Sequence, residues 1–252
     1  MIKMYLRKRM RILRGFVRSF IKPVKNNYKA DTWWDSIFYT KGLSNPKTLG
    51  PDKSLLSSFY HYNSVELLIL RHFYNKNLNP EGATVLDIGS GAGYWIDFYK
   101  KIGAGDCTGI DVSKSSVAFL KEKYQSDPSI NIQHGSIVNL LPNSNEKYDI
   151  INAIGVMFHV VDDKEWQQSL ELLSGALKPD GIFVIGGHFG AIDNLNVHVD
   201  KNGQVFKRLH SAGRWKRALR QLGFRKIKLY RNNAYLHIND TLPENNILIA
   251  GK

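Results

Sequence analysis

Three glycines stand between an apolar segment and an amphipathic one in the run ATVLDIGSGAGYWIDFYKK, residues 83–101. We predict a strand over residues 84–88 and a helix over residues 93–102, with Gly89, Gly91 and Gly93 in the turn between them. Such a turn places main-chain N–H groups beside a ligand. Glycine is needed there because side chains would block the close approach or the positive φ. The run therefore predicts a ligand-binding turn.

The spacing of these glycines separates two classes of ligand. A dinucleotide turn has the pattern G-x-G-x-x-G, but Tyr94 stands where the third glycine of that pattern belongs. Asp87, two residues before the turn, disfavours a pyrophosphate and favours an ammonium group. Asp111 ends the next predicted strand, where its carboxylate can accept bonds from both hydroxyls of a ribose. These residues predict a nucleoside-like ligand without phosphate that carries a cationic amino-acid part.

Over residues 64–252 the chain resembles the class I S-adenosylmethionine-dependent methyltransferases. The resemblance rests on the run DIGSGAG (87–93), on Asp111 after Gly-Ile, on YDII (148–151) and on GALKPDGIFVIG (175–186). It implies an α/β fold, in which a Rossmann-like seven-stranded sheet has helices on both faces and an antiparallel last strand. It also implies S-adenosylmethionine as the cofactor and methyl transfer as the reaction.

The resemblance also assigns expected roles to individual residues. The glycine turn with Asp87 would face the methionine and ribose parts of the cofactor, Asp111 would hold the ribose hydroxyls, and Ser136 would border the adenine in place of a more usual acid. Residues 153–159 would line the floor where donor and acceptor meet. The implied cofactor-binding residues are Asp87, Gly89, Ser90, Gly91, Gly93, Asp111, Val112, Ser136, Ile137 and Ala153.

Two histidines are candidates for a general base that takes a proton from an acceptor hydroxyl. His159 follows the fourth predicted strand and His188 follows the fifth, both at the sheet edge where such folds bind ligands. An imidazole suits this role because it ordinarily titrates near neutral pH. Asp162 and Asp163 are adjacent acids, but they begin a predicted helix, where N-capping accounts for them better than a metal does. We therefore expect no metal.

Strands and helices alternate from residue 84 onwards, which predicts parallel strands joined by crossover helices. Predicted strands cover residues 84–88, 107–111, 130–133, 148–153 and 181–186, and predicted helices cover 93–102, 113–125 and 163–177. A hairpin is predicted over 195–209 around Asn202-Gly203. A helix over 211–222 follows, and then strands over 225–231 and 246–251 that should pair antiparallel at one sheet edge.

Two parts of the chain are expected. Residues 1–63 combine a basic amphipathic helix with a lead-in rich in aromatic residues, and residues 64–252 form the methyltransferase domain. We expect the second part to begin with a helix over 64–75 capped by Ser64, with Leu67, Leu68, Leu70 and Phe73 on its buried side. The aromatic residues of the lead-in would stack against a ring or form a lid.

The formal net charge of +13 is unevenly distributed. Residues 1–30 hold ten Lys or Arg and no acid, and residues 200–231 hold eleven against one acid, so the rest of the chain sums to 13 − 10 − 10 = −7. This pattern favours specific anionic surfaces over general nucleic-acid binding. Residues 1–21 are expected either to lie on an anionic membrane or to pack against their own domain.

The chain has one cysteine, Cys107, and no apolar run near the ~18 residues that span a membrane, which favours a reducing, cytoplasmic compartment. The expected acceptor is a small molecule, a glycan or a lipid-linked compound with anionic character, methylated on oxygen. An RNA methyltransferase is the alternative, although residues 152–155 read NAIG where base-amine enzymes often have an Asn/Asp-Pro-Pro-aromatic run. A non-catalytic binding protein and a dehydrogenase are the remaining alternatives.

Overall fold

A computed structural model describes residues 28–49, 54–199, 205–232 and 246–252. The predicted basic helix over residues 1–21 and the predicted Asn202-Gly203 turn lie outside the described residues. Within them, no helix is both long enough and apolar enough to cross a membrane.

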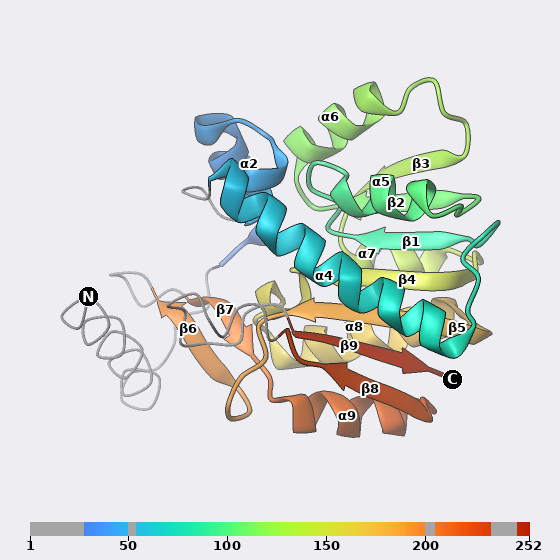
Figure 1. Cartoon of the computed structure of the whole chain (residues 1–252). Coiled ribbons are helices and arrows are strands. Elements are labelled where there is room, and N and C mark those ends of the chain that lie inside the picture. The colour runs from blue at the N-terminus through green and yellow to red at the C-terminus, as the bar shows by residue number, and fades with distance from the viewer. Residues whose placement is uncertain (1–27, 50–53, 200–204, 233–245) are drawn as a thin grey trace.

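A seven-stranded sheet forms the centre of the molecule, in the order β3-β2-β1-β4-β5-β9-β8 (Figure 1). Strands β1 to β5 are parallel, and β9 is antiparallel to both of its neighbours. The predicted mixed sheet with an antiparallel last strand is therefore confirmed. The strands are β1 (Val85–Ile88), β2 (Cys107–Asp111), β3 (Ile130–His134), β4 (Tyr148–Ile154), β5 (Leu177–Gly187), β8 (Lys226–Tyr230) and β9 (Asn246–Gly251).

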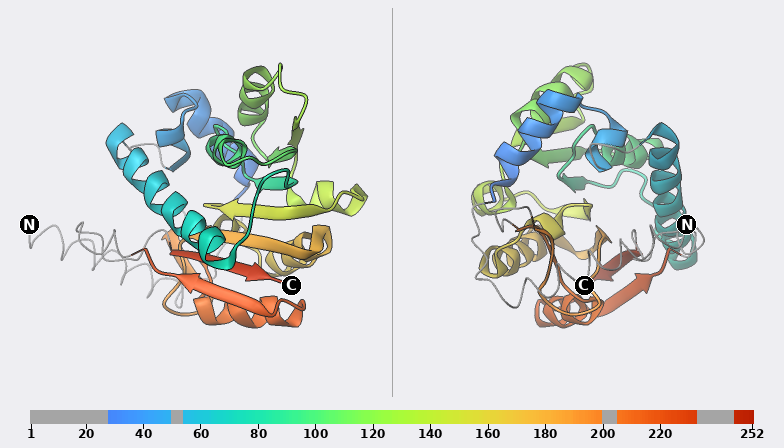
Figure 2. Two further views of the ribbon diagram at one scale, coloured as in Figure 1. Left: turned by 45° about the vertical axis from the view of Figure 1, so that its right-hand side comes forward. Right: turned by 90° about the vertical axis from the view of Figure 1, so that its left-hand side faces the viewer.

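Helices cover both faces of this sheet because each strand sends alternate side chains to opposite sides. Val85 contributes to one apolar core with α4, α5 and α6, whereas Leu86 contributes to the other core with α7, α8 and α9. Figure 2 shows the sheet between these two helical layers. The helices are α4 (Leu55–Lys76), α5 (Tyr94–Lys101), α6 (Lys114–Lys123), α7 (Ile137–Leu140), α8 (Asp163–Ala176) and α9 (Ala212–Gln221).

Polar side chains fix the ends of these elements as the sequence predicts. The Asp162 carboxylate accepts hydrogen bonds from the backbone N–H groups of Lys164 and Glu165, both at 2.9 Å, and so caps α8. Asp149, at the start of β4, accepts from the Thr84 hydroxyl and from the Lys178 ammonium. Asp162 thus fixes the start of α8, and Asp149 fixes the amino end of β4, opposite the end at which such sheets bind ligands.

Helix α4 differs from its prediction. It begins at Leu55 rather than at Ser64, because Ser54 is its N-cap and accepts from the Ser57 N–H at 3.1 Å. Ser64 lies inside the helix, where its hydroxyl donates back to the His61 carbonyl. The helix thus crosses the expected boundary between residues 63 and 64 without a break.

The faces of α4 also differ from the prediction. Leu68 and Phe73 are buried as expected, but Leu67 and Leu70 are exposed. The longer helix buries its Tyr62, Val65 and Ile69 side instead, and the helical period of 3.6 residues turns Leu67 and Leu70 outward.

The lead-in and the hairpin complete the molecule at the carboxyl end of the sheet. The lead-in forms α2 (Ala30–Lys41) and α3 (Asn45–Leu49). The hairpin forms a separate two-stranded sheet of β6 (Leu195–Val199) and β7 (Val205–Leu209), which confirms its prediction.

Candidate functional site

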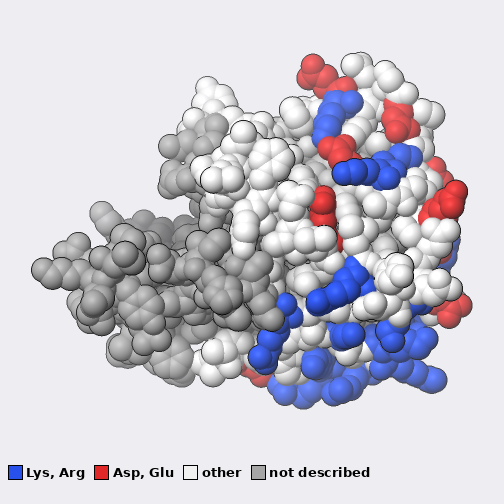
Figure 3. Space-filling view, in the orientation of Figure 1, with Lys and Arg blue, Asp and Glu red and all other residues white. Residues whose placement is uncertain are grey.

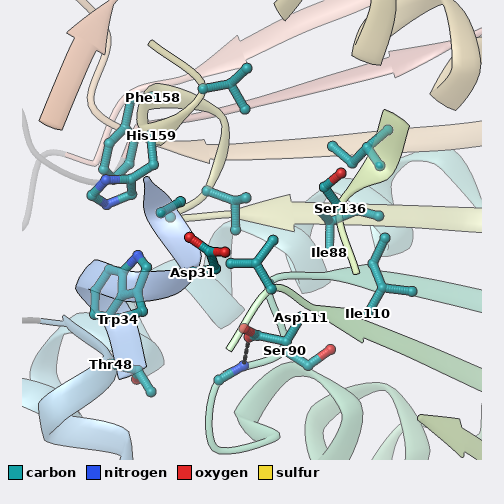
Figure 4. Close-up of a pocket in the computed structure, with 18 of the residues that line it drawn as sticks. Asp31, Trp34, Thr48, Ile88, Ser90, Ile110, Asp111, Ser136, Phe158 and His159 are labelled. Atoms are coloured by element: carbon teal, nitrogen blue, oxygen red, sulfur yellow. Dashed lines mark hydrogen bonds between the residues drawn. The ribbon is translucent and has the colours of Figure 1, made fainter. Parts of the chain in front are cut away.

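A cavity of about 950 Å³ lies where β1, β2 and β4 end (Figure 4). This volume is near the upper end of the usual range for small-molecule sites, which is roughly 300–1,000 Å³. The turns after the strands form one end of the cavity. Side chains from α2, from the segment after β4 and from the hairpin form the other end.

The glycine turn approaches the cavity with bare main chain. Gly89, Gly91 and Gly93 all have positive φ, at 67°, 54° and 83°. A Cβ added to Gly89 would stand 2.5 Å from Val156, and one added to Gly91 would stand 2.7 Å from Thr48. Side chains at Gly89 and Gly91 would therefore be strained and would also clash with residues that line the cavity. Gly93, expected among the cofactor-binding residues, does not line the cavity, and a Cβ there would meet Leu120 of α6 instead.

Asp111, at the end of β2, is buried and holds two loops together. Its Oδ2 accepts from the Gly91 N–H at 2.8 Å (Figure 4). Its Oδ1 accepts from the Ser113 N–H, also at 2.8 Å. Burial raises the pKa of this carboxyl, although the two backbone bonds act in the opposite direction. A carboxylate has about four acceptor positions, so two backbone bonds leave capacity for hydroxyl donors in the cavity.

Asp87 lies behind the glycine turn and does not line the cavity. It is fully buried in β1, and its Oδ1 accepts from Asn152 Nδ2 at 2.7 Å. Burial raises its pKa to about 7. Its Oδ2 is buried without a hydrogen-bond partner. The expected direct contact with the ligand is thus replaced by a buried carboxylate that acts on the turn from behind.

The adenine end expected from the sequence lies along the segments after β2 and β3. Val112, Ser136 and Ile137 all line the cavity there. Ser136 is the N-cap of α7 but makes no side-chain capping bond. Ala153 is a correction, because it is fully buried in the core, and Ile154, Gly155 and Val156 after it form the cavity wall instead.

Aromatic side chains surround the opposite end of the cavity. Trp33 stacks on Phe206 of β7 with ring centroids 5.4 Å apart, and the Trp34 ring meets His159 edge-on at 5.4 Å. Tyr28 also contacts His159, with ring centroids 6.3 Å apart. The lead-in and the hairpin are distant in sequence, but they enclose the same space.

Both candidate bases line this aromatic end. His159 Nδ1 lies 2.8 Å from the Phe206 carbonyl oxygen. A carbonyl only accepts, so this bond requires a proton on Nδ1, and the lone pair of the neutral ring is then on Nε2. His188 Nε2 lies 3.4 Å from the Lys207 ammonium, which can donate to it. The structure therefore gives the two histidines different hydrogen-bonding environments.

A cap from α2 reaches the cofactor end, and the sequence analysis did not identify it. Asp35 Oδ1 accepts from the Ser113 hydroxyl at 2.6 Å and from the Ser115 N–H at 3.1 Å. Burial acts to raise the pKa of Asp35, but these hydrogen bonds hold it below its usual value. Asp35 stands among aromatic and small polar residues of the lead-in, with no local motif that would mark it as a site residue.

These features fit a nucleoside with a cationic tail. The clashes at Gly89 and Gly91 define a main-chain cradle, and the unpartnered Asp87 Oδ2 lies behind it, where a cationic ligand would favour the ionised carboxylate. Asp111 presents a carboxylate at the end of the neighbouring strand. The residues present are thus suited to S-adenosylmethionine.

Comparisons with known proteins agree with this geometry. Residues 85–181 match the family model of a methyltransferase domain. A ubiquinone biosynthesis O-methyltransferase of Methylobacterium nodulans is 24% identical over 163 residues, which cover 61% of this chain and 57% of that protein. A ribosomal protein L11 methyltransferase of Dictyoglomus thermophilum is 30% identical over 113 residues, which cover 44% of this chain and 34% of that protein.

A solved structure has the same fold over most of its length. The 1,6-didemethyltoxoflavin-N1-methyltransferase of Burkholderia thailandensis, with its acceptor and S-adenosylhomocysteine bound, has a TM-score of 0.60 and 15% identity. The match covers 91% of this chain and 93% of that one. Residues 85–181 thus form a methyltransferase domain, and the matches agree with the class I S-adenosylmethionine-dependent methyltransferase family, fold and cofactor expected from the sequence.

Proposed function

We propose that this protein transfers a methyl group from S-adenosylmethionine to an oxygen atom of a small acceptor that carries a flat ring. The observation that supports this proposal most directly is the continuity of the cavity. The glycine turn and Asp111 stand at one end, and an aromatic wall with His159 stands at the other. When bound, the cofactor supplies a methyl group activated by its sulfonium.

At the cofactor end, the bare main chain of Gly89, Ser90 and Gly91 would give the methionine part room to approach. Asp111 would accept from the ribose hydroxyls, and Ser136 with Ile137 would border the adenine. Alignment of donor and acceptor supplies most of the acceleration in such a transfer, up to ~7–11 kcal/mol. The rigid turn, fixed by Asp111 on one side and Thr48 on the other, suits this positioning role.

At the acceptor end, Trp33, Trp34 and Phe206 would stack against the flat faces of a ring. Lys207 also lines this end and adds positive charge, which suits a carboxylate or phosphate on the acceptor. The aromatic walls of the cavity favour a small ring compound over a folded protein or an RNA strand, because either polymer would need to insert its reacting group past the α2 helix.

His159 is the favoured general base. Its Nδ1 proton is directed to the Phe206 carbonyl, which fixes the ring with Nε2 as the nitrogen that receives a proton. The Lys207 ammonium is placed to donate to His188 Nε2, so we assign His188 to acceptor binding instead. Removing a base of this kind lowers the rate by about 10²–10⁴-fold when the acceptor is a hydroxyl.

The relatives support oxygen as the reacting atom without fixing the acceptor. Several are named ubiquinone biosynthesis O-methyltransferases, and others are named for ribosomal protein L11. The chain spans 57% of the first of these relatives, so their acceptors are not assigned to this chain by the match alone. The aromatic cavity is the reason for preferring a ring compound.

The test begins with calorimetry of the purified protein with S-adenosylhomocysteine, where an absence of binding would favour the non-catalytic alternative. Methyl-labelled S-adenosylmethionine is then supplied with hydroxylated aromatic acids, aromatic amines, a glycan and single-stranded RNA, and the products are read by mass spectrometry. We expect labelling of an aromatic hydroxyl and its loss in His159→Gln, with smaller effects in His188→Gln. Labelling of RNA alone would overturn the proposal.

A further inference from the structure

Helix α4 has a second apolar side that faces outward. Its inward side supplies Tyr62, Val65 and Ile69 to the core. Its outward side carries five large apolar residues at helical spacing, in a row that Asn63 interrupts between Phe59 and Leu67. This α4 stripe consists of Leu56, Phe59, Leu67, Leu70 and Tyr74.

The α4 stripe is well exposed. The exposed fraction is 79% for Leu56, 66% for Leu67 and 89% for Tyr74. A single exposed leucine is ordinary on a protein surface, but a row of this length on one helix is typical of an interaction site. The only acid between residues 55 and 76 is Glu66, and it accepts a hydrogen bond from the Tyr94 hydroxyl.

Cations lie beside the α4 stripe. Tyr230 of β8 points to the α4 side of the sheet, where its hydroxyl bonds to His72 Nδ1 at 2.7 Å. Lys226 and Lys228 share that side of β8 because strand side chains alternate. The Arg71 guanidinium and the Lys228 ammonium both lie over the Tyr230 ring, at 5.2 and 4.8 Å. Among the described residues, no ion pair involves Arg71, Lys226 or Lys228.

The apolar and basic groups share one face of the molecule. Figure 3 shows blue side chains over the region of β8 and α9, below a largely white band that follows α4. We name the stripe together with Arg71, Lys226 and Lys228 the α4 face. It is separate from the cavity lining, although His61 and Tyr62 of the same helix line the cavity.

We propose that the α4 face docks on an anionic lipid bilayer. Leucine and aromatic side chains insert among acyl chains and headgroups, and flanking Lys and Arg attract anionic headgroups. A second copy of the chain fits this face less well, because pairing two stripes would bring like charges together. Single-stranded RNA also fits less well, since it needs stacking rings and the stripe is mainly leucine.

Flotation of the full-length protein with lipid vesicles tests this proposal. We expect flotation with phosphatidylcholine vesicles that contain phosphatidylglycerol, and little with phosphatidylcholine alone. The double variant Leu67→Ser with Tyr74→Ser should lower the partition coefficient roughly tenfold or more. Phe119→Ser is the matched control, because Phe119 is an exposed aromatic residue on α6.

The contribution of the Lys and Arg side chains to binding is tested by a second pair of variants, one on the α4 face and one control. Lys226→Gln with Lys228→Gln should lower partitioning about fivefold for each cation removed. Lys114→Gln with Lys121→Gln removes the same charge from α6 and should change it little. Residues 1–21 are present in every variant, so any contribution from them is constant across each pair. Equal flotation of face and control variants would overturn the proposal, as would no flotation of the unaltered protein.

A site-specific signal distinguishes insertion from general adhesion. Cys107 is the single cysteine and is buried, so Tyr74→Cys creates one reactive thiol for an environment-sensitive dye. We expect a blue shift of the dye on anionic vesicles and none for the same dye on Phe119→Cys. Sedimentation without lipid completes the test. If the unaltered protein is a dimer and the double variant Leu67→Ser with Tyr74→Ser is a monomer, the α4 face binds a second copy of the chain, and the proposal is overturned.

Discussion

Asp35 of α2 and Ser113 at the N-terminus of α6 join the lead-in to the cofactor end of the cavity. The Ser113 hydroxyl donates to the Asp35 carboxylate at 2.6 Å, and the Ser113 N–H donates to Asp111. One serine thus links the expected ribose-binding acid to the helix that carries Trp33 and Trp34. The aromatic wall and the cofactor end are therefore mechanically connected.

This connection predicts the behaviour of Asp35→Ala. Removing a charged acceptor of two hydrogen bonds frees α2 from α6, and we expect the Kd for S-adenosylhomocysteine to rise about tenfold. Because α2 acts as a cap, most of the change should be in the dissociation rate measured by stopped flow. Asp180→Ala, an exposed acid away from the cavity, is the control. An unchanged dissociation rate would show that α2 does not hold the cofactor in place.

Asp111→Asn tests the expected ribose contact. The Asp111 carboxylate accepts from both the Gly91 N–H and the Ser113 N–H. An asparagine amide has only one acceptor oxygen, so its NH₂ group would face one of these two N–H donors. We expect the Kd for S-adenosylhomocysteine, measured by calorimetry, to rise about 10–100-fold. Asp106→Asn is the control, because Asp106 is an exposed acid one residue before the same strand. Equal affinities for the two variants would remove Asp111 from the binding site.

The requirement for glycine at position 89 can be tested by comparison with Gly82, a glycine of similar φ outside the cavity. Gly89 and Gly82 have φ of 67° and 71°, but an added Cβ would meet Val156 at 2.5 Å in one case and nothing within 4 Å in the other. Gly82→Ala should cost about 1 kcal/mol of stability in urea unfolding because of its positive φ, and Gly89→Ala should cost more because of the added clash. Only Gly89→Ala should lose cofactor affinity. Adding Val156→Ala should restore part of that affinity, and an absence of rescue would contradict the steric explanation.

The elements of the sheet were predictable because their signals are local. The apolar runs, the glycine turn and the run Lys178-Pro179-Asp180-Gly181 each identify a strand or its ends without reference to distant residues. The position of α4 was less predictable. Two serines ten residues apart both suit an N-cap, and the choice of Ser54 over Ser64 is coupled to long-range contacts such as the hydrogen bond from Asn232 to Ser64.

Within the site, the residues that follow the ends of strands were placed at the cavity correctly. A contribution from a distant segment of the chain was not identified. Gly89, Gly91, Asp111 and Ser136 line the cavity as expected. Asp35 was missed because its partner Ser113 is 78 residues away in the sequence. Asp87 was expected to face the ligand, but it is fully buried in β1. The alternation of side chains along a four-residue strand does not show which of them other elements cover.

Asp87 gives the protein a pH-dependent stability with a definite sign. Its pKa is raised by burial from 3.8 to about 7, so between these values the folded state holds a proton that the unfolded state has released. Stability should therefore fall as pH rises from about 4 to 7, by up to ~1.4 kcal/mol per pH unit from this group. Asp87→Asn removes the titrating carboxyl. The difference in unfolding free energy, unaltered protein minus variant, should therefore decline as pH rises from about 4 to 7.

The same carboxylate should respond to the cofactor. A cationic ligand at the glycine turn favours ionised Asp87, so S-adenosylmethionine should bind more tightly as pH rises through about 7, whereas Asp87→Asn should bind with little pH dependence. Urea unfolding and calorimetry at pH 5, 6, 7 and 8 measure both effects. Parallel pH profiles for the unaltered protein and Asp87→Asn would contradict this prediction. They would mean that Asp87 is ionised from pH 5 to 8 and that its buried Oδ2 accepts a hydrogen bond even without the cofactor.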